Sequence, residues 1–96
     1  MKLDKRIHEP ARLQIMTHLI TEGRTARFTD LKQSLGLTQG NLASHLKVLE
    51  KAGFVVQTTA EADPYACHIQ LTTAGREAFV EYLDTLNEVL GKLAGS

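Results

Sequence analysis

The middle of this chain carries side chains that can form hydrogen bonds with nucleic-acid bases and neutralise phosphates. Gln39 and Asn41 have amide groups, each of which can form a pair of hydrogen bonds with the edge of an adenine. The Ser44 hydroxyl can donate to a base or to a phosphate, and Lys47 and Lys51 can neutralise phosphates. These residue types indicate contact with double-stranded DNA, provided that one element presents them together.

In a single helix after Thr38, Ser44, Lys47 and Lys51 fall on one face together with Gly40. Asn41 flanks this face, and Gln39 lies at the N-terminal tip of the helix, which normally enters the groove. At about 100° per residue, Leu42, Leu46 and Leu49 fall on the opposite face and are expected in the core. We predict DNA contacts from Thr38, Gln39, Gly40, Asn41, Ser44, His45, Lys47 and Lys51, with Arg27 and Lys32 contacting backbone phosphates. His45 lies at the border of the two faces, where a partly buried structural role is the favoured alternative. Polar residues also occur on any surface helix. Whether these residues contact DNA therefore depends on where the helix lies in the fold.

The residues before Thr38 indicate how that helix is held. Thr29 is suited to cap a short helix, and Asp30 then lies near the positive end of the helix dipole. Gly36 suits a tight turn after this helix, and Thr38 can cap the next one. The pattern predicts a helix-turn-helix at about 29–52, whose second helix can enter the DNA major groove.

A β-hairpin is predicted directly after these helices. Residues 54–60 are rich in β-branched types, Glu61-Ala62-Asp63-Pro64 forms a turn, and residues 65–71 form the returning strand. By alternation, one face of that strand carries Tyr65, Cys67, Ile69 and Leu71. The hairpin, at about 54–71, would be the wing of a winged helix.

Further helices are expected on both sides of this unit. Leu3 and Ile7 lie one helical turn apart and predict a helical lead-in, and Pro10 suits the first turn of the next helix, which Gly23 ends. The resulting fold class is α+β and mainly α. It is a winged helix-turn-helix with a β-hairpin wing and a long C-terminal helix, in a single domain over residues 1–96.

The final helix, at about 72–93, carries an apolar seam. Phe79, Leu83, Leu86, Leu90 and Leu93 are spaced four, three, four and three residues apart, which is the heptad pattern of paired helices. A small domain has limited core to cover this stripe, so we predict a homodimer interface. Its residues are Leu3, Ile7, Phe79, Tyr82, Leu83, Leu86, Leu90 and Leu93. Packing within one chain is the alternative, because it accounts for any amphipathic helix.

Charge is divided unevenly along a chain of zero net charge and pI near 6.9. Residues 1–51 hold nine lysines and arginines against five acidic residues, whereas residues 52–96 hold two against six. The basic half contains the helix-turn-helix, as expected of a protein with one surface towards DNA, although chance can produce the same division. The chain shows no apolar run that could span a membrane and no secretory signal, and its single Cys67 fits a reducing compartment. We therefore expect a cytoplasmic protein.

No arrangement of residues typical of catalysis or metal binding is recognisable. The four histidines, His8, His18, His45 and His68, are scattered, and the adjacent Cys67 and His68 would point to opposite faces of a strand. Neither a nucleophile–base pair nor a phosphate-binding loop occurs. We predict no enzymatic activity, no metal and no cofactor. Cys67 is expected to be a buried apolar residue, with a redox switch as the alternative.

The run Gly-Asn-Leu-Ala-Ser-His-Leu-Lys-Val-Leu-Glu-Lys-Ala-Gly-Phe-Val at residues 40–55 resembles small winged-helix transcriptional regulators of the MarR/ArsR type. His-Glu-Pro-Ala-Arg-Leu-Gln-Ile at 8–15 and Leu-Thr-Thr-Ala-Gly-Arg at 71–76 are also similar to that group. The resemblance implies a prokaryotic repressor or activator that binds operator DNA as a homodimer. Residues 39, 41 and 44 would read bases, and the hairpin would contact the neighbouring minor groove or backbone. Relatives often have arginine in place of Ser44 and a basic wing tip in place of the acidic turn at 61–64.

The predicted function is therefore that of a sequence-specific, homodimeric DNA-binding transcriptional regulator. The alternative is a winged-helix module for protein–protein interaction, which the neutral pI and the acidic turn favour. An unknown small-molecule effector, if one exists, would bind at the dimer interface or in the cleft between it and the DNA-binding core.

Overall fold

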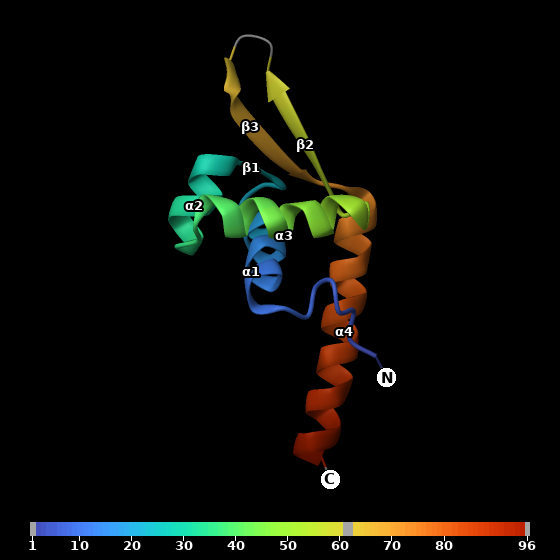
Figure 1. The fold of residues 1–96 in the computed structure, drawn as a ribbon. Helices are drawn as coiled ribbons and strands as arrows, with labels where there is room; N and C mark the ends of the chain where they lie inside the picture. Colours follow the sequence, from blue (N-terminus) through green and yellow to red (C-terminus); the bar gives the residue numbers. More distant parts are fainter. Residues whose placement is uncertain (1, 61–62, 96) are drawn as a thin grey trace.

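The computed structural model describes residues 2–60 and 63–95, which form four helices and three strands (Figure 1). In chain order these are α1 (Pro10–Thr21), β1 (Thr25–Arg27), α2 (Phe28–Leu35), α3 (Gln39–Lys51), β2 (Val55–Ala60), β3 (Asp63–Leu71) and α4 (Thr73–Gly95). Helices α2 and α3 form the helix-turn-helix, and β2 and β3 form the wing. The predicted winged-helix fold is confirmed.

The N-terminal segment, residues 2–9, forms a turn and not the predicted helical lead-in. The His8 N–H donates to the carbonyl oxygen of Asp4 at 2.7 Å, and the Arg6 N–H donates to the Asp4 carboxylate at 2.9 Å. The turn cannot continue as a helix, because proline disfavours helical backbone in the residue before it. Glu9 accordingly has φ −145° and ψ 133°, and α1 begins with Pro10 as predicted.

Caps at the helix-turn-helix agree with the predictions at two of three positions. Gly36 has φ 64°, a left-handed conformation that favours glycine, and the Thr38 side chain accepts a hydrogen bond from the Asn41 N–H at 3.2 Å. The predicted cap at Thr29 is wrong, because α2 already begins at Phe28, after Arg27. Arg27 is paired with β3 in extended backbone, so the helix starts directly where the strand pairing ends.

The sheet is antiparallel with strand order β1-β3-β2. Val55 pairs with Leu71 at the base of the wing, and Ala60 pairs with Asp63 towards its tip. Strand β3 therefore begins within the predicted turn, of which Glu61 and Ala62 lie outside the described residues. The wing projects from the C-terminal end of α3, away from the helices (Figure 1).

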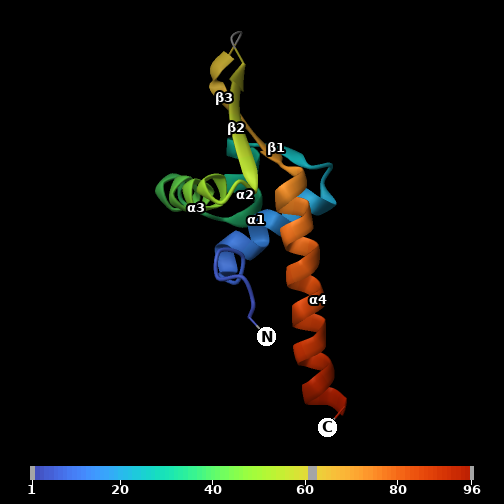
Figure 2. The same cartoon turned by 90° about the vertical axis from the view of Figure 1, so that its right-hand side faces the viewer.

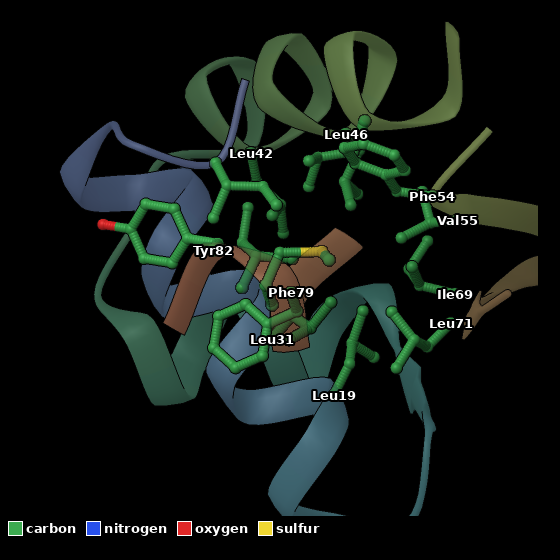
Figure 3. Close-up of a cluster of buried hydrophobic side chains, with 14 residues drawn as sticks. Leu19, Leu31, Leu42, Leu46, Phe54, Val55, Ile69, Leu71, Phe79 and Tyr82 are labelled. Atoms are coloured by element: carbon green, nitrogen blue, oxygen red, sulfur yellow. The ribbon is translucent and has the colours of Figure 1, made fainter. Parts of the chain in front are cut away.

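The core lies where α3 crosses the other elements. Leu42 and Leu46 point from α3 into a cluster that also contains Leu31 from α2, Ile69 from β3 and Phe79 from α4 (Figure 3). All five side chains are buried, as is Leu49. Because burying one leucine side chain stabilises a fold by about 1.5–3 kcal/mol, this face fixes which side of α3 remains outside.

Helix α4 extends well past the rest of the molecule (Figure 2). Thr72 caps it as predicted, since its hydroxyl oxygen accepts from the Gly75 N–H at 2.9 Å, but the helix continues to Gly95, beyond the expected end near Leu93. The molecule measures 56 × 25 × 21 Å, with a radius of gyration of 14.5 Å. A compact chain of this length would have about 12.5 Å. No helix within the described residues is both long and apolar enough to cross a membrane.

Candidate nucleic-acid interface

One side of α3 is free of contacts with the core. The reading face consists of Gln39, Gly40, Asn41, Ser44 and Lys47, all of which are exposed. The helix lies across the front of the molecule in Figure 1, with α1 behind it. The predicted division of this helix into an apolar face and a polar face is therefore present in the structure.

The N-terminal end of α3 offers polar backbone close to the reading face. Thr38 is exposed and fixes the first turn through its side chain. A Cβ atom added at Gly40 would meet no atom within 4 Å, so packing within the chain does not require a glycine there. The missing side chain leaves space for another molecule to approach the backbone, where the helix dipole favours a phosphate.

The predicted phosphate contacts lie on three elements. Lys51 is exposed at the end of α3, Arg27 is exposed at the end of β1, and Lys32 is exposed on α2. Within the described residues, the ion pairs closer than 4 Å join Arg6 to Asp4 and His45 to Glu9. Among the side chains that the structure describes, no carboxylate therefore forms an ion pair with the cationic groups of the proposed DNA surface.

His45 is partly buried at the edge of the reading face, where it contacts α1 and the residue before that helix. Its side chain is 23% exposed, and its Nδ1 atom lies 3.1 Å from Nη1 of Arg12 and 3.6 Å from the carboxylate of Glu9. Partial burial raises the pKa of Glu9, but the backbone N–H groups of Arg12 and Ala11, together with the positive charge of Arg12, outweigh it and leave the pKa below its usual value. This geometry supports the structural role over base reading.

Sequence reasoning missed Glu9 and Arg12. Arg12 is 33 positions from His45, and helical periodicity relates only residues of the same helix. The position of His45 between the polar and apolar faces of the helix indicated a partly buried side chain. It could not identify Arg12 or Glu9 as the residues that His45 contacts.

Cys67 lies in β3, half-buried against the core. Its thiol donates a long hydrogen bond to the side-chain oxygen of Gln57 at 3.6 Å. Burial, assisted by the negative charge of Glu50, raises the pKa of this thiol. A redox sensor needs a lowered thiol pKa, so the environment disfavours the switch alternative.

The apolar seam of α4 is divided between the core and the surface. Phe79 and Tyr82 are at most 5% exposed, and Ile7 is fully buried, so these three residues have little surface to offer a partner. Their assignment to a dimer interface requires correction, because the protomer's own core covers them. Leu3 and Leu86 are half-buried against that core. The exposed part of the seam consists of Leu83 at 45%, Leu90 at 54% and Leu93 at 74%.

Comparisons with known proteins agree with this fold. The family model described as "Winged helix DNA-binding domain" matches residues 11–90. A solved transcriptional regulator homologue from Pyrococcus horikoshii OT3 is 35% identical, covers 92% of this chain and 87% of its own, and superimposes with a TM-score of 0.86. Protein MJ0432 from Methanocaldococcus jannaschii is 42% identical over 57 residues, which are 58% of this chain and 62% of that relative. The chain thus matches less than two thirds of the length of MJ0432.

A MarR-like transcriptional regulator from Thermotoga maritima, tm0816, shares the fold with a TM-score of 0.66 at 23% identity, covering 92% of this chain and 62% of its own. The two solved structures are described as transcriptional regulators, and the matched family as a DNA-binding domain, so neither these neighbours nor the family is enzymatic. The chain belongs to the family of winged helix DNA-binding domains.

Proposed function

We propose that this protein is a sequence-specific transcriptional regulator of the cytoplasm that binds operator DNA as a homodimer, with α3 in the major groove. The observation that carries the proposal is the reading face of α3, which is polar, exposed and held in place by the buried leucines of the opposite face. In helix-turn-helix proteins the second helix lies in the groove, and its N-terminal residues contact the bases.

Each member of the reading face has a chemical role in this proposal. Gln39 and Asn41 form paired hydrogen bonds with adenine edges, and Ser44 bonds a base or a phosphate. Lys47 and Lys51 neutralise phosphates, which supplies affinity without sequence preference. Arg27 and Lys32 would contact the backbone beside the groove. The acidic sequence of the wing turn is repelled by phosphate, so we expect the wing to contribute little.

A homodimer is supported by the apolar surface that α4 leaves exposed. Leu83 is exposed although it follows the buried Tyr82, and Leu90 and Leu93 are exposed in the last turns of α4, the end of which extends past the body of the molecule (Figure 2). A second copy would remove these side chains from water, and a two-fold axis there would present two α3 helices to one duplex. Half-sites about 34 Å apart, one turn of DNA, would match such a pair.

A cleft of about 770 Å³ offers a place for a small-molecule effector. It lies between the N-terminal segment and α4 and is lined by apolar and polar groups, including Leu3, Arg6, Phe54 and Tyr82. Small-molecule sites have this size and combination of residues. A ligand in the cleft would contact both α4 and the segment that leads to α1.

The experiment that tests the proposal is duplex binding measured from about 50 to 200 mM salt by fluorescence anisotropy. We expect affinity to fall steeply, because each phosphate contact releases counterions and adds about 0.9 to the negative log–log slope. Absent binding at low salt, or affinity that does not change over this range, would instead support the protein–protein interaction module.

Base reading is tested by Asn41→Ala, with Lys51→Ala on the same helix as the matched control. A cognate duplex is first obtained by selection from a random pool. Asn41→Ala should reduce discrimination at one base pair by about 1–3 kcal/mol, whereas Lys51→Ala should weaken cognate and random duplexes alike and lower the salt slope by about 1. Equal weakening of both duplexes by Asn41→Ala would contradict its base-reading role.

A further inference from the structure

The guanidinium group of Arg12 joins three parts of the molecule. Its Nε donates to the carbonyl oxygen of Arg6 at 2.6 Å, and its Nη2 donates to the carbonyl oxygen of Lys5 at 3.4 Å. Its Nη1 lies 3.1 Å from Nδ1 of His45. One side chain on α1 therefore connects the N-terminal segment with the middle of α3.

Arg12 is itself fixed at its base. Its backbone N–H donates to the Glu9 carboxylate at 2.8 Å in the cap of α1, and the apolar side of that helix is buried in the core. Because the Arg12 backbone is fixed and its guanidinium group is planar, the hydrogen-bond partners of this group are held in a defined geometry. His45 directly follows Ser44 and lies one turn after Asn41, so its position bears on the orientation of the reading face.

The contact between Arg12 and His45 requires a neutral imidazole. Arginine has only donors and remains charged in proteins, so Nδ1 of His45 must accept and the ring proton must be on Nε2. The same Nδ1 atom lies 3.6 Å from the Glu9 carboxylate. With a proton on Nδ1, this atom would be a donor. It could then no longer accept the hydrogen bond from Arg12 and would face the Glu9 carboxylate instead. These are the two charged groups that the described structure places within 4 Å of the ring.

We propose that Arg12 is a positioning residue, which sets the sequence discrimination of α3 by holding neutral His45. This inference rests on the proposed DNA-binding function. It differs from a direct phosphate contact, in which Arg12 would add affinity for every sequence. It also differs from a purely structural role, in which Arg12 would change stability and leave discrimination unaltered.

The test compares the affinity ratio of cognate to random duplex for wild type and Arg12→Gln, with exposed Arg76→Gln on α4 as the matched control for loss of one positive charge. We expect Arg12→Gln to lower the ratio about tenfold with an unchanged salt slope, and Arg76→Gln to leave it unchanged. An unchanged ratio in Arg12→Gln, or a salt slope reduced by about 1 with the ratio intact, would overturn the proposal.

A second variant keeps the proposal testable if Arg12→Gln folds poorly. His45→Gln supplies an uncharged acceptor for Arg12, so it should retain the wild-type ratio at about pH 8. A ratio in His45→Gln as low as that expected for Arg12→Gln would overturn the proposal.

Nitrogen-15 NMR of the DNA-free protein separates this inference from the proposed function. At about pH 8 the His45 ring should show an unprotonated Nδ1 and a protonated Nε2, and Arg12→Gln should shift the Nδ1 resonance. A proton on Nδ1 at this pH would refute the inference even if DNA binding is normal. Failure of wild type to bind duplex with a salt dependence would refute the proposed function alone.

Discussion

Gly75→Ala is expected to lower the free energy of unfolding by about 2–3 kcal/mol, because the added methyl group has no space. A Cβ atom at Gly75 would collide with the carbonyl oxygen of Phe54 and lie 2.9 Å from Cδ1 of Leu71. The Phe54 carbonyl is backbone and accepts a hydrogen bond from the Thr72 N–H at 3.0 Å, so it cannot turn away without loss. Alanine favours a helix by about 1 kcal/mol over glycine, and the collision must outweigh that gain.

The matched control is Gly91→Ala in the same helix. No atom lies within 4 Å of a Cβ at Gly91, so this substitution should raise stability by about 0.5–1 kcal/mol through helix propensity alone. Urea unfolding followed by circular dichroism measures both. Equal or greater stability of Gly75→Ala compared with wild type would show that α4 can move away from Phe54 at little cost.

The double substitution Leu83→Glu with Leu90→Glu is expected to give a monomer and to weaken binding to a two-site operator about 100-fold or more. The two leucines lie seven residues apart on the exposed part of the α4 seam. In a dimer each would be buried against a second copy, and burial of an unpaired carboxylate is strongly unfavourable. Linked binding of two modules commonly adds a factor of about 10²–10⁴, which a monomer loses.

The control for charge is Lys92→Glu, which changes the net charge by the same two negative units. Lys92 is exposed and lies nine residues after Leu83, on the opposite side of the helix. It should leave the mass measured by light scattering and the operator affinity close to those of wild type. Binding to a single half-site should be similar for all three proteins. A wild type that is monomeric at micromolar concentration, or a double variant that stays dimeric, would contradict the proposed interface.

Local rules accounted for much of the fold. The periodicity of α3 separated Leu42, Leu46 and Leu49 from the exposed polar residues, because the period of a helix is set by its own hydrogen bonds. Gly36 and Thr38 were recognisable because their roles depend on one turn of chain. The predicted cap at Thr29 was wrong because strand pairing, which is not local, sets the start of α2.

Contacts between distant segments could not be predicted. The α4 seam was correctly recognised as apolar, but a heptad pattern does not tell whether the protomer or a second copy covers each position. Phe79 and Tyr82 proved to be core residues, whereas Leu90 remained exposed. Within the site, the exposed position of Asn41 followed from the helical wheel, but the contact of His45 with Arg12 joins two helices and has no local signature.

The hydrogen bonds at Thr72 have a consequence for how this protein can vary. The Thr72 hydroxyl donates to the Gly53 carbonyl oxygen at 2.6 Å, and its N–H donates to the Phe54 carbonyl oxygen. These two bonds join the chain before the wing to the chain after it. They connect the end of α3 directly with the start of α4, and the outer part of the hairpin takes no part in this connection. The part of the wing beyond Thr58 and His68 is in effect an insertion into the frame that these bonds close, because β1 pairs with β3 only up to His68 and the buried Val55, Ile69 and Leu71 lie before that point. Its length and charge are free to change during evolution while the angle between α3 and α4 is kept.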